Sequence, residues 1–279
     1  MGECTLDSLT VYPLKGAQGV GVKEVEVRRG GIVGDRQVML VKDGENYAQR
    51  DHPQVATIAV DLLEDGRIAL SQASAGDFTH EVSGQGGEVP IKLLHNAITT
   101  LDQGDEIAAW ACAAMKEEGL RVVSLPKPWD KWIPLPVFER IDGKPQAQLY
   151  DVAPLLVNNQ ASLDDFNTRA SEPVPMDRFR ANVVVGGLAA YEEDDVERLS
   201  SDEVELLFVT ACERCVMTTT DQQTGVRANK EPIKTLSRYR RRDDKYASGV
   251  VFGSYMTPVK EGTLRVGDRL AVEKREARA

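Results

Sequence analysis

The stretch ACERCVMTTTDQQTG, residues 211–225, carries the most informative chemistry in the chain. Two cysteines, Cys212 and Cys215, stand three positions apart, and Arg214 directly precedes the second. A positive charge beside a cysteine favours its thiolate, which is the form that binds a soft metal. The β-branched residues that follow, up to Thr220, favour a strand. Asp221 to Gly225 is typical of a turn.

The cysteine pair alone leaves several interpretations open. A zinc site needs two more ligands at suitable spacing. No second C-x-x-C is present, and all three histidines lie more than a hundred residues upstream, at His52, His80 and His95. A thioredoxin-type pair needs its second cysteine at the start of a helix, where a strand is expected here. Two packed thiols are a further possibility. A single thiolate can also hold a metal if an organic chelator such as molybdopterin supplies the other sulfurs.

Composition limits the class of protein. The chain has 279 residues, 42% of them hydrophobic, which allows one large or two modest domains. Its net charge of −10 argues against nucleic-acid binding. The longest uncharged apolar run, 107–115, is about half of the ~20 residues that a bilayer requires, and the first ten residues are not a secretory signal. We therefore expect a cytoplasmic protein that does not enter a membrane. The four cysteines exclude a disulfide scaffold and argue against an iron–sulfur cluster in this chain.

Short β-branched runs bounded by Gly and Pro predict many strands, within 20–27, 38–41, 58–62, 68–70, 183–185, 204–209, 250–252 and 264–266. Strands of this spacing are typical of barrels or strongly bent sheets. Helices are predicted at 107–115, on apolar offsets of 0, 3, 4, 7 and 8 and with Gly119 as the stop, and at 160–169 and 232–240. The Pro-rich stretch 126–136 is the expected linker between domains 1–120 and 130–274. The acidic segment 192–205 is expected to be a solvated loop, and the tail 274–279 to be frayed.

Five segments in order resemble one family over nearly the whole chain. The first three are Tyr12–Gly16 with Gly34–Arg36, then Phe179–Asn182, then 212–240 with its Lys230-Glu231-Pro232. The last two are Phe252–Tyr255 and Gly262–Asp268. Together they are similar to MOSC-domain proteins, in particular the mitochondrial amidoxime-reducing components (mARC) and bacterial hydroxylaminopurine-reducing homologues. The resemblance implies an α+β, predominantly β fold. It would have a MOSC N-terminal β-barrel domain over 1–120 and a MOSC β-barrel domain with peripheral helices over 130–274.

The resemblance also implies an activity and a cofactor. The expected protein is a molybdenum cofactor-dependent oxidoreductase that reduces N-hydroxylated compounds (amidoximes, hydroxylamines and N-hydroxylated purines) in detoxification. Cys215 would be the catalytic residue and the molybdenum ligand, with Cys212 close by but not ligating. The residues that match cofactor contacts are Lys15, Gly16, Arg36, Asp151, Ala153, Arg180, Asn182, Arg214 and Tyr255. Gly16, Val152 and Ala153 lack the hydroxyls of some relatives, so contacts there would be through the main chain.

The electron source is expected to be a separate protein. No Rossmann fingerprint is present and no cysteine follows Cys215, so a ferredoxin, cytochrome or flavin reductase would have to supply electrons. The basic residues Arg238 and Arg240–Arg242 either dock such a carrier or form a solvated helix end. Two other functions remain open. One is a non-catalytic carrier of the cofactor, or of sulfur as a persulfide on Cys215. The other is a zinc-stabilised binding module that uses Cys212 and Cys215.

Overall fold

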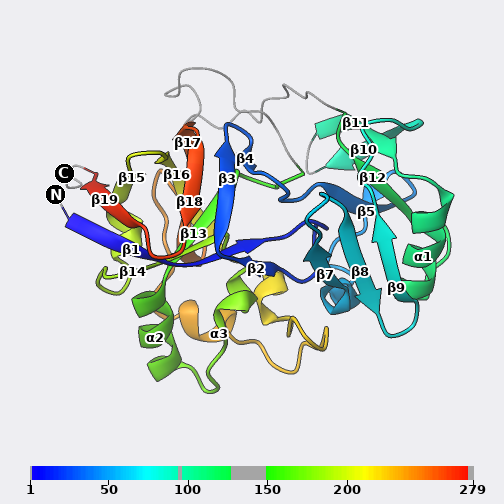
Figure 1. Cartoon of the computed structure of the whole chain (residues 1–279). Helices are drawn as coiled ribbons and strands as arrows, with labels where there is room; N and C mark the ends of the chain where they lie inside the picture. The colour runs from blue at the N-terminus through cyan, green and yellow to red at the C-terminus, as the bar shows by residue number, and fades with distance from the viewer. Residues whose placement is uncertain (1, 94–95, 127–148, 276–279) are drawn as a thin grey trace.

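A closed seven-stranded barrel forms the larger part of the molecule (Figure 1). This computed structural model describes residues 2–93, 96–126 and 149–275. The barrel strands run in the order β14-β13-β17-β16-β15-β19-β1, and pairing of β1 with β14 closes the ring. Their bounds are β1 Gly2–Val11, β13 Leu155–Asn159, β14 Val183–Gly186, β15 Val196–Ser200, β16 Glu205–Glu213, β17 Val251–Lys260 and β19 Arg269–Lys274. The short strand β2 (Val20–Val22) extends this sheet beyond β1.

A second closed barrel has five strands. They are β5 (Val38–Lys42), β6 (Glu45–Asn46), β10 (Glu88–Leu93), β11 (Asn96–Asp102) and β12 (Arg121–Ser124). A three-stranded meander of β7 (Ala59–Leu62), β8 (Ile68–Gln72) and β9 (Gly76–His80) lies beside it, after a 3₁₀ turn, η1 (Pro53–Thr57). The helix α1 (Asp105–Met115) buries the predicted face, with Ile107, Ala111 and Ala114 at most 3% exposed. The predicted β-rich fold with two barrels is therefore confirmed.

The first strands of the chain pair with its last ones. β1 lies between β19 and β14 in the larger barrel, and β3 (Glu24–Arg28) pairs with both β4 (Gly31–Ile32) and β18 (Gly262–Arg265). Alternation along β1 explains its place, because Cys4, Leu6 and Leu9 are buried in the core of the larger barrel. The expected division into 1–120 and 130–274 stays a prediction, and residues 127–136 of the expected linker lie outside the described residues.

The remaining helices are short and lie at the surface of the larger barrel (Figure 1). α2 (Gln160–Arg169) has the predicted bounds and begins at Asn159, whose side chain accepts a hydrogen bond from the Ala161 amide. The helix predicted at 232–240 is reduced to α3 (Ile233–Leu236). Three 3₁₀ turns complete the set: η3 (Met176–Phe179), η4 (Glu192–Asp195) and η5 (Val216–Thr219). Among the described residues, none of the helices has the length and apolar character needed to cross a bilayer.

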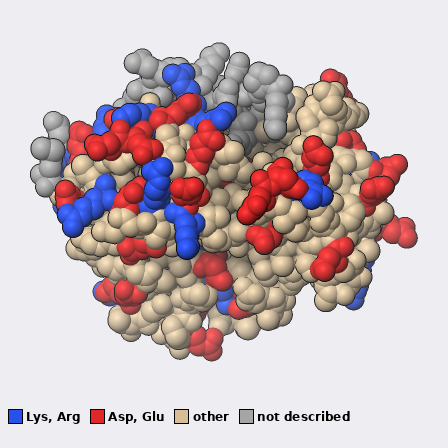
Figure 2. Space-filling view, viewed as in Figure 1, with Lys and Arg blue, Asp and Glu red and all other residues tan. Residues whose placement is uncertain are grey.

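Two sequence expectations about charged segments are wrong in part. Residues 192–200 form η4 and β15 instead of a solvated loop, and Glu193 is only 1% exposed, whereas 201–204 is a loop in which Asp202 and Glu203 are exposed. Lys274 ends β19 instead of starting a frayed tail. The Arg275 guanidinium lies 3.7 Å from the Phe208 ring centroid and donates to the Val196 carbonyl. Residues 276–279 lie outside the described range. Figure 2 shows one face of the molecule, on which acidic and basic side chains are interspersed.

Candidate functional site

A cavity of about 520 Å³ is lined by residues of both barrels. Lys15, Gly16, Arg36 and the β6 and β10 residues come from the N-terminal part of the chain, and the β16 and β17 residues from the C-terminal part. Every site residue predicted from sequence lines it, namely Lys15, Gly16, Arg36, Asp151, Ala153, Arg180, Asn182, Arg214, Cys215 and Tyr255. Val152 and Cys212 do so too. The fold thus brings together residues that are up to 240 positions apart in the chain, from 15 to 255.

Cys215 is a free, half-buried thiol at the start of η5. Its carbonyl accepts hydrogen bonds from the Thr218 amide (3.1 Å) and the Thr218 hydroxyl (3.0 Å). The Thr219 hydroxyl donates in the same way to the Val216 carbonyl (2.7 Å). The strand expected from the β-branched run 216–220 is therefore wrong. Threonine hydroxyls that bond local carbonyls stabilise a turn in place of a ladder, and this turn presents Cys215 to the cavity.

The Arg214 side chain is directed at Cys212 and not at the adjacent Cys215. One guanidinium nitrogen lies 2.7 Å from Cys212 Sγ, and another donates to the Phe179 carbonyl (2.8 Å). The positive charge that was expected to act on Cys215 therefore lies against Cys212, the other cysteine of the C-x-x-C. Tyr255 completes this cluster: burial, and then its contact with Cys212, raise the pKa of the phenol well above its ordinary value. The phenol is therefore protonated at neutral pH.

Lys15 is fixed at one wall of the cavity. Its ammonium donates to Asp151 Oδ1 (2.6 Å) and to the Leu149 carbonyl (2.8 Å). Burial would raise the pKa of the Asp151 carboxyl, but Lys15, then Arg36 and Arg50, outweigh it and leave that pKa below its ordinary value. The neighbouring Gly16 has φ of +90°, and an added Cβ would lie 3.1 Å from Val55 Cγ1. Both facts disfavour a residue with a side chain, such as serine, at this position.

The buried side chain of Asp35, which is 1% exposed, positions Arg36 and Asn182 through hydrogen bonds. Asp35 Oδ2 accepts from Arg36 Nη1, and Asp35 Oδ1 accepts from Asn182 Nδ2 (3.1 Å) and from the Tyr12 amide (2.8 Å). Arg36 Nη1 also donates to Asn182 Oδ1 (2.9 Å). Charge-assisted bonds of this kind are strong and directional. They hold the two side chains in one arrangement at the edge of the cavity.

Arg180 forms part of the cavity wall. Its Nη1 donates to the Ala17 carbonyl (2.6 Å) and to Gln222 Oε1 (2.9 Å), and its guanidinium lies 4.3 Å from the Tyr12 ring centroid. Burial lowers the pKa of this guanidinium to about 10, so it remains charged at neutral pH. Its backbone is in the left-handed region, with φ of +55°. This conformation turns the chain from η3 toward β14.

Comparisons with known protein families match both parts of the chain. A family model described as MOSC N-terminal beta barrel domain matches residues 3–118, and one described as MOSC domain matches residues 144–271. The chain belongs to the MOSC family.

Its relatives include mitochondrial amidoxime reducing component 2 of Bos taurus, with 33% identity over 95% of this chain and 82% of that protein. Mitochondrial amidoxime-reducing component 1 of Homo sapiens is 31% identical over 95% of this chain and 81% of that protein. Among solved structures, the YUAD protein from Bacillus subtilis aligns with 99% of this chain and 98% of its own, at a TM-score of 0.45 and 9% identity.

Several cavity residues of this MOSC protein were missed from sequence. The main ones are Arg50, Lys92 and Arg178, with Gln49 and Phe179 beside them. Arg178 lies in η3 and Arg180 follows directly after η3, and the position of Arg178 two residues before Arg180 was the available signal. Arg50 and Lys92 come from the smaller barrel, and nothing in their local sequence links them to Cys215. Of the described lining residues, seven are Lys or Arg and four are Asp or Glu, although the whole chain carries −10.

The basic run 238–242 is mostly engaged within the protein. Arg240 donates to Asp194 Oδ2 (2.7 Å) and lies over the Tyr191 ring at 4.3 Å from its centroid. Arg242 pairs with Asp244 (2.7 Å) and Asp194 (3.6 Å). Both side chains are about 10% exposed. They are therefore too buried to belong to the expected docking surface or to a solvated helix end. Arg238 and Arg241 are exposed.

The described residues provide no set of ligands for the zinc site that the sequence left open. Within residues 2–93, 96–126 and 149–275, no group of three or more His, Cys, Asp or Glu side chains is placed to hold a metal ion. The guanidinium beside Cys212 Sγ also takes the place that a cation would need there.

Proposed function

We propose that this MOSC protein reduces N-hydroxylated compounds with a molybdenum cofactor that Cys215 ligates. The observation that carries the proposal is the convergence of Cys215 and the nine other predicted residues on one cavity with a cationic wall. Relatives over 95% of the chain are named as amidoxime reducing components. We propose amidoximes, hydroxylamines and N-hydroxylated purines as the substrate class.

The residues of the cavity fit the molybdopterin group chemically. A cavity of about 520 Å³ is within the ~300–1,000 Å³ of small-molecule and cofactor sites. The cofactor is anionic through its phosphate, and Lys15, Arg36 and Arg180 supply fixed cations for it. Polar atoms are also left over: Arg178 Nε, Arg214 Nε and Gln49 Oε1 are buried without a partner among the described residues. A polar bicyclic ligand would satisfy such groups. Cys215 offers a thiolate of the soft kind that molybdenum binds.

The proposed roles of the chain's own residues follow from their contacts. When bound, the cofactor would supply the two-electron reduction of the N–O bond, with water as the second product. Lys15 and Arg36 would hold the anionic end, because Asp151 and Asp35 fix their positions. Tyr255 would donate a hydrogen bond inside the cavity, since its phenol remains protonated. The main chain at Asp151 to Ala153 would supply contacts where hydroxyls are absent.

The electron donor and the compartment are also proposals. We expect a separate ferredoxin, cytochrome or flavin reductase to supply electrons. We expect a cytoplasmic protein, although the relatives named above are mitochondrial.

Turnover of 6-hydroxylaminopurine with an artificial electron donor tests the reductase. Purified protein with cofactor should reduce the substrate, and Cys215→Ala should abolish this. Cys112→Ser is the matched control, since Cys112 is also a free, half-buried thiol but lies in α1, away from the cavity. Undiminished turnover in Cys215→Ala would refute the proposal. Cofactor binding without any turnover would instead support the carrier function.

A further inference from the structure

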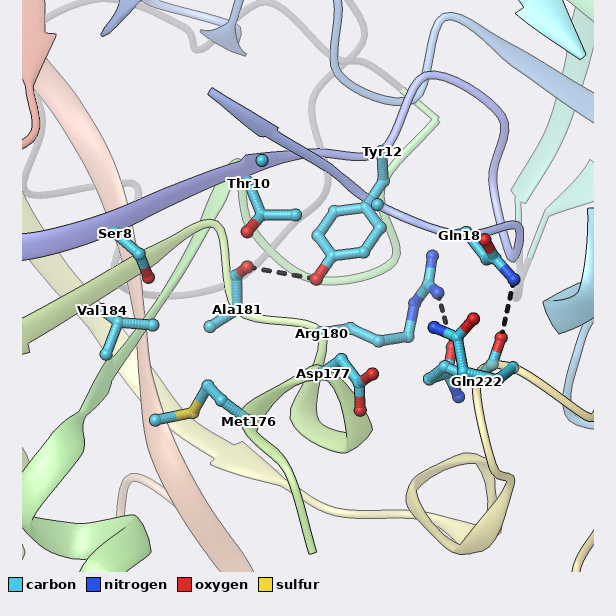
Figure 3. A pocket seen from close by; sticks show the side chains of 13 residues that line it. Ser8, Thr10, Tyr12, Gln18, Met176, Asp177, Arg180, Ala181, Val184 and Gln222 are labelled. Carbon is cyan, nitrogen blue, oxygen red and sulfur yellow. Dashed lines mark hydrogen bonds between the residues drawn. The ribbon is translucent and has the colours of Figure 1, made fainter. Parts of the chain in front are cut away.

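A second cavity has a volume of about 210 Å³. Arg180 lines both cavities, and Gln222 beside it lines the second. Figure 3 shows Ser8, Thr10 and Tyr12 on one side of the second space and Met176 and Asp177 on the other. No predicted cofactor residue other than Arg180 lines it. It is therefore separate from the site described above.

Asp177 is the group in this cavity that lacks a partner. Its Oδ1 is buried and accepts no hydrogen bond from the described residues. Terminal nitrogens of both neighbouring arginines have other partners: Arg178 Nη2 pairs with Asp221 (3.2 Å), and Arg180 Nη1 donates to Ala17 and Gln222. Burial raises the pKa of the Asp177 carboxyl above its ordinary value, and the two arginines only partly oppose this. A buried carboxylate oxygen without a donor is costly to the folded protein, and a ligand that supplies N–H groups would offset that cost.

The rest of the wall defines the shape of a ligand. Gly21 in β2 borders open space, because an added Cβ would meet no atom within 4 Å. Gly19 is different, since its Cβ would lie 2.4 Å from Thr10 Cγ2. Val184 is buried and Met176 is half-buried, and they give the cavity an apolar part of its wall beside the polar groups. A ligand would therefore carry N–H donors at one end and a short apolar body.

We propose that this cavity binds a small organic cation of the amidinium or guanidinium type. Its paired N–H groups would donate to the Asp177 carboxylate, and its body would contact Met176 and Val184. Planar N–H donors match a carboxylate in charge and geometry, which makes such bonds stronger than neutral ones. The inference does not depend on the cofactor or on the proposed reductase activity. It concerns a site that Arg180 and Gln222 separate from the larger cavity.

Calorimetric titration of the full chain with benzamidine tests the proposal, with neutral benzamide as the matched probe. Saturable binding of benzamidine at millimolar concentration or tighter is expected, with benzamide at least about tenfold weaker. Asp177→Asn should weaken benzamidine binding by about tenfold or more. Gly21→Ile should abolish it by filling the open space.

Gly84→Ile is the control for the glycine substitution, because Gly84 also borders open space but lies outside both cavities. It should bind benzamidine as the unmodified chain does. Thermal unfolding of each variant checks that it is folded. The proposal would be overturned by the absence of saturable heat, by equal binding of benzamide, or by binding that persists in Asp177→Asn or Gly21→Ile.

Discussion

Replacement of Asp35 by Asn should destabilise the protein strongly. Asp35 and Arg36 form a buried ion pair, with side-chain exposures of 1% and 15%. Asparagine keeps the shape and one acceptor for the Tyr12 amide, but it removes the carboxylate that is hydrogen-bonded to the Arg36 guanidinium. Removal of one partner from a buried pair costs about 3–5 kcal/mol. For a chain of this size, 1 kcal/mol corresponds to about 2–4 °C in Tm, so a fall of about 6–20 °C is expected.

Thermal unfolding of the cofactor-free chain followed by circular dichroism measures this shift. Asp65→Asn is the matched control, because Asp65 pairs with Arg67 at the surface and its loss should not measurably change Tm. If the unpaired cation is the cause, the double variant Asp35→Asn/Arg36→Met should recover part of the loss. The reasoning is refuted if Asp35→Asn has the same Tm as Asp65→Asn, or if the double variant has a lower Tm than Asp35→Asn alone.

Two further predictions concern the larger barrel. Burial, and then Asp194, raise the pKa of Glu193 from 4.5 to about 7. The folded state therefore holds this proton more tightly than the unfolded state does. Because of this difference, the stability of the protein should fall as pH rises from about 4.5 to 7. Glu193→Gln should flatten this dependence in urea unfolding at pH 5 and pH 8, and an unchanged slope would contradict the assignment. Phe252 is fully buried, and its ring centroid lies 4.0 Å from that of Phe179. Its replacement by Ala should lower the free energy of unfolding by about 3–5 kcal/mol. A loss below about 1 kcal/mol in the same urea assay would contradict the packing argument.

Local patterns in the sequence were sufficient for α1, α2 and some of the strands, whereas β1, β10 and β11 were not predicted. The apolar offsets at 107–115 predicted α1, since a face with that spacing has to be buried. The bounds of α2 follow from Asn159 as a cap and from the apolar side chains Leu163 and Phe166. The strand segments were found because β-branched runs between turn residues have few other stable conformations.

Side-chain contacts, both local and long-range, decided the elements that the sequence mispredicted. The threonines after Cys215 form a turn because their hydroxyls bond nearby carbonyls, which strand propensity does not register. In the acidic segment 192–205, Glu193 and Asp194 are buried, and Arg240, nearly fifty positions later, pairs with Asp194. The direction of Arg214 toward Cys212 likewise depends on rotamers, not on adjacency.

The site residues were predictable only where family resemblance marked them. Lys15, Arg36 and Arg180 are individually ordinary basic residues, and their convergence depends on the pairing of β1 with strands from the end of the chain. Arg50 and Lys92 show the converse, because they line the same cavity without any sequence mark. A cavity between two barrels is assembled by long-range pairing, which single-sequence patterns do not encode.

Molybdenum and zinc content by mass spectrometry tests the central claim most directly. The chain, Cys215→Ser and Cys112→Ser would be purified from a host that makes molybdopterin. The account predicts near-stoichiometric molybdenum in the unmodified chain and in Cys112→Ser, and a clear loss in Cys215→Ser. Protein that contains zinc and no molybdenum, or molybdenum content that does not change in Cys215→Ser, would contradict it.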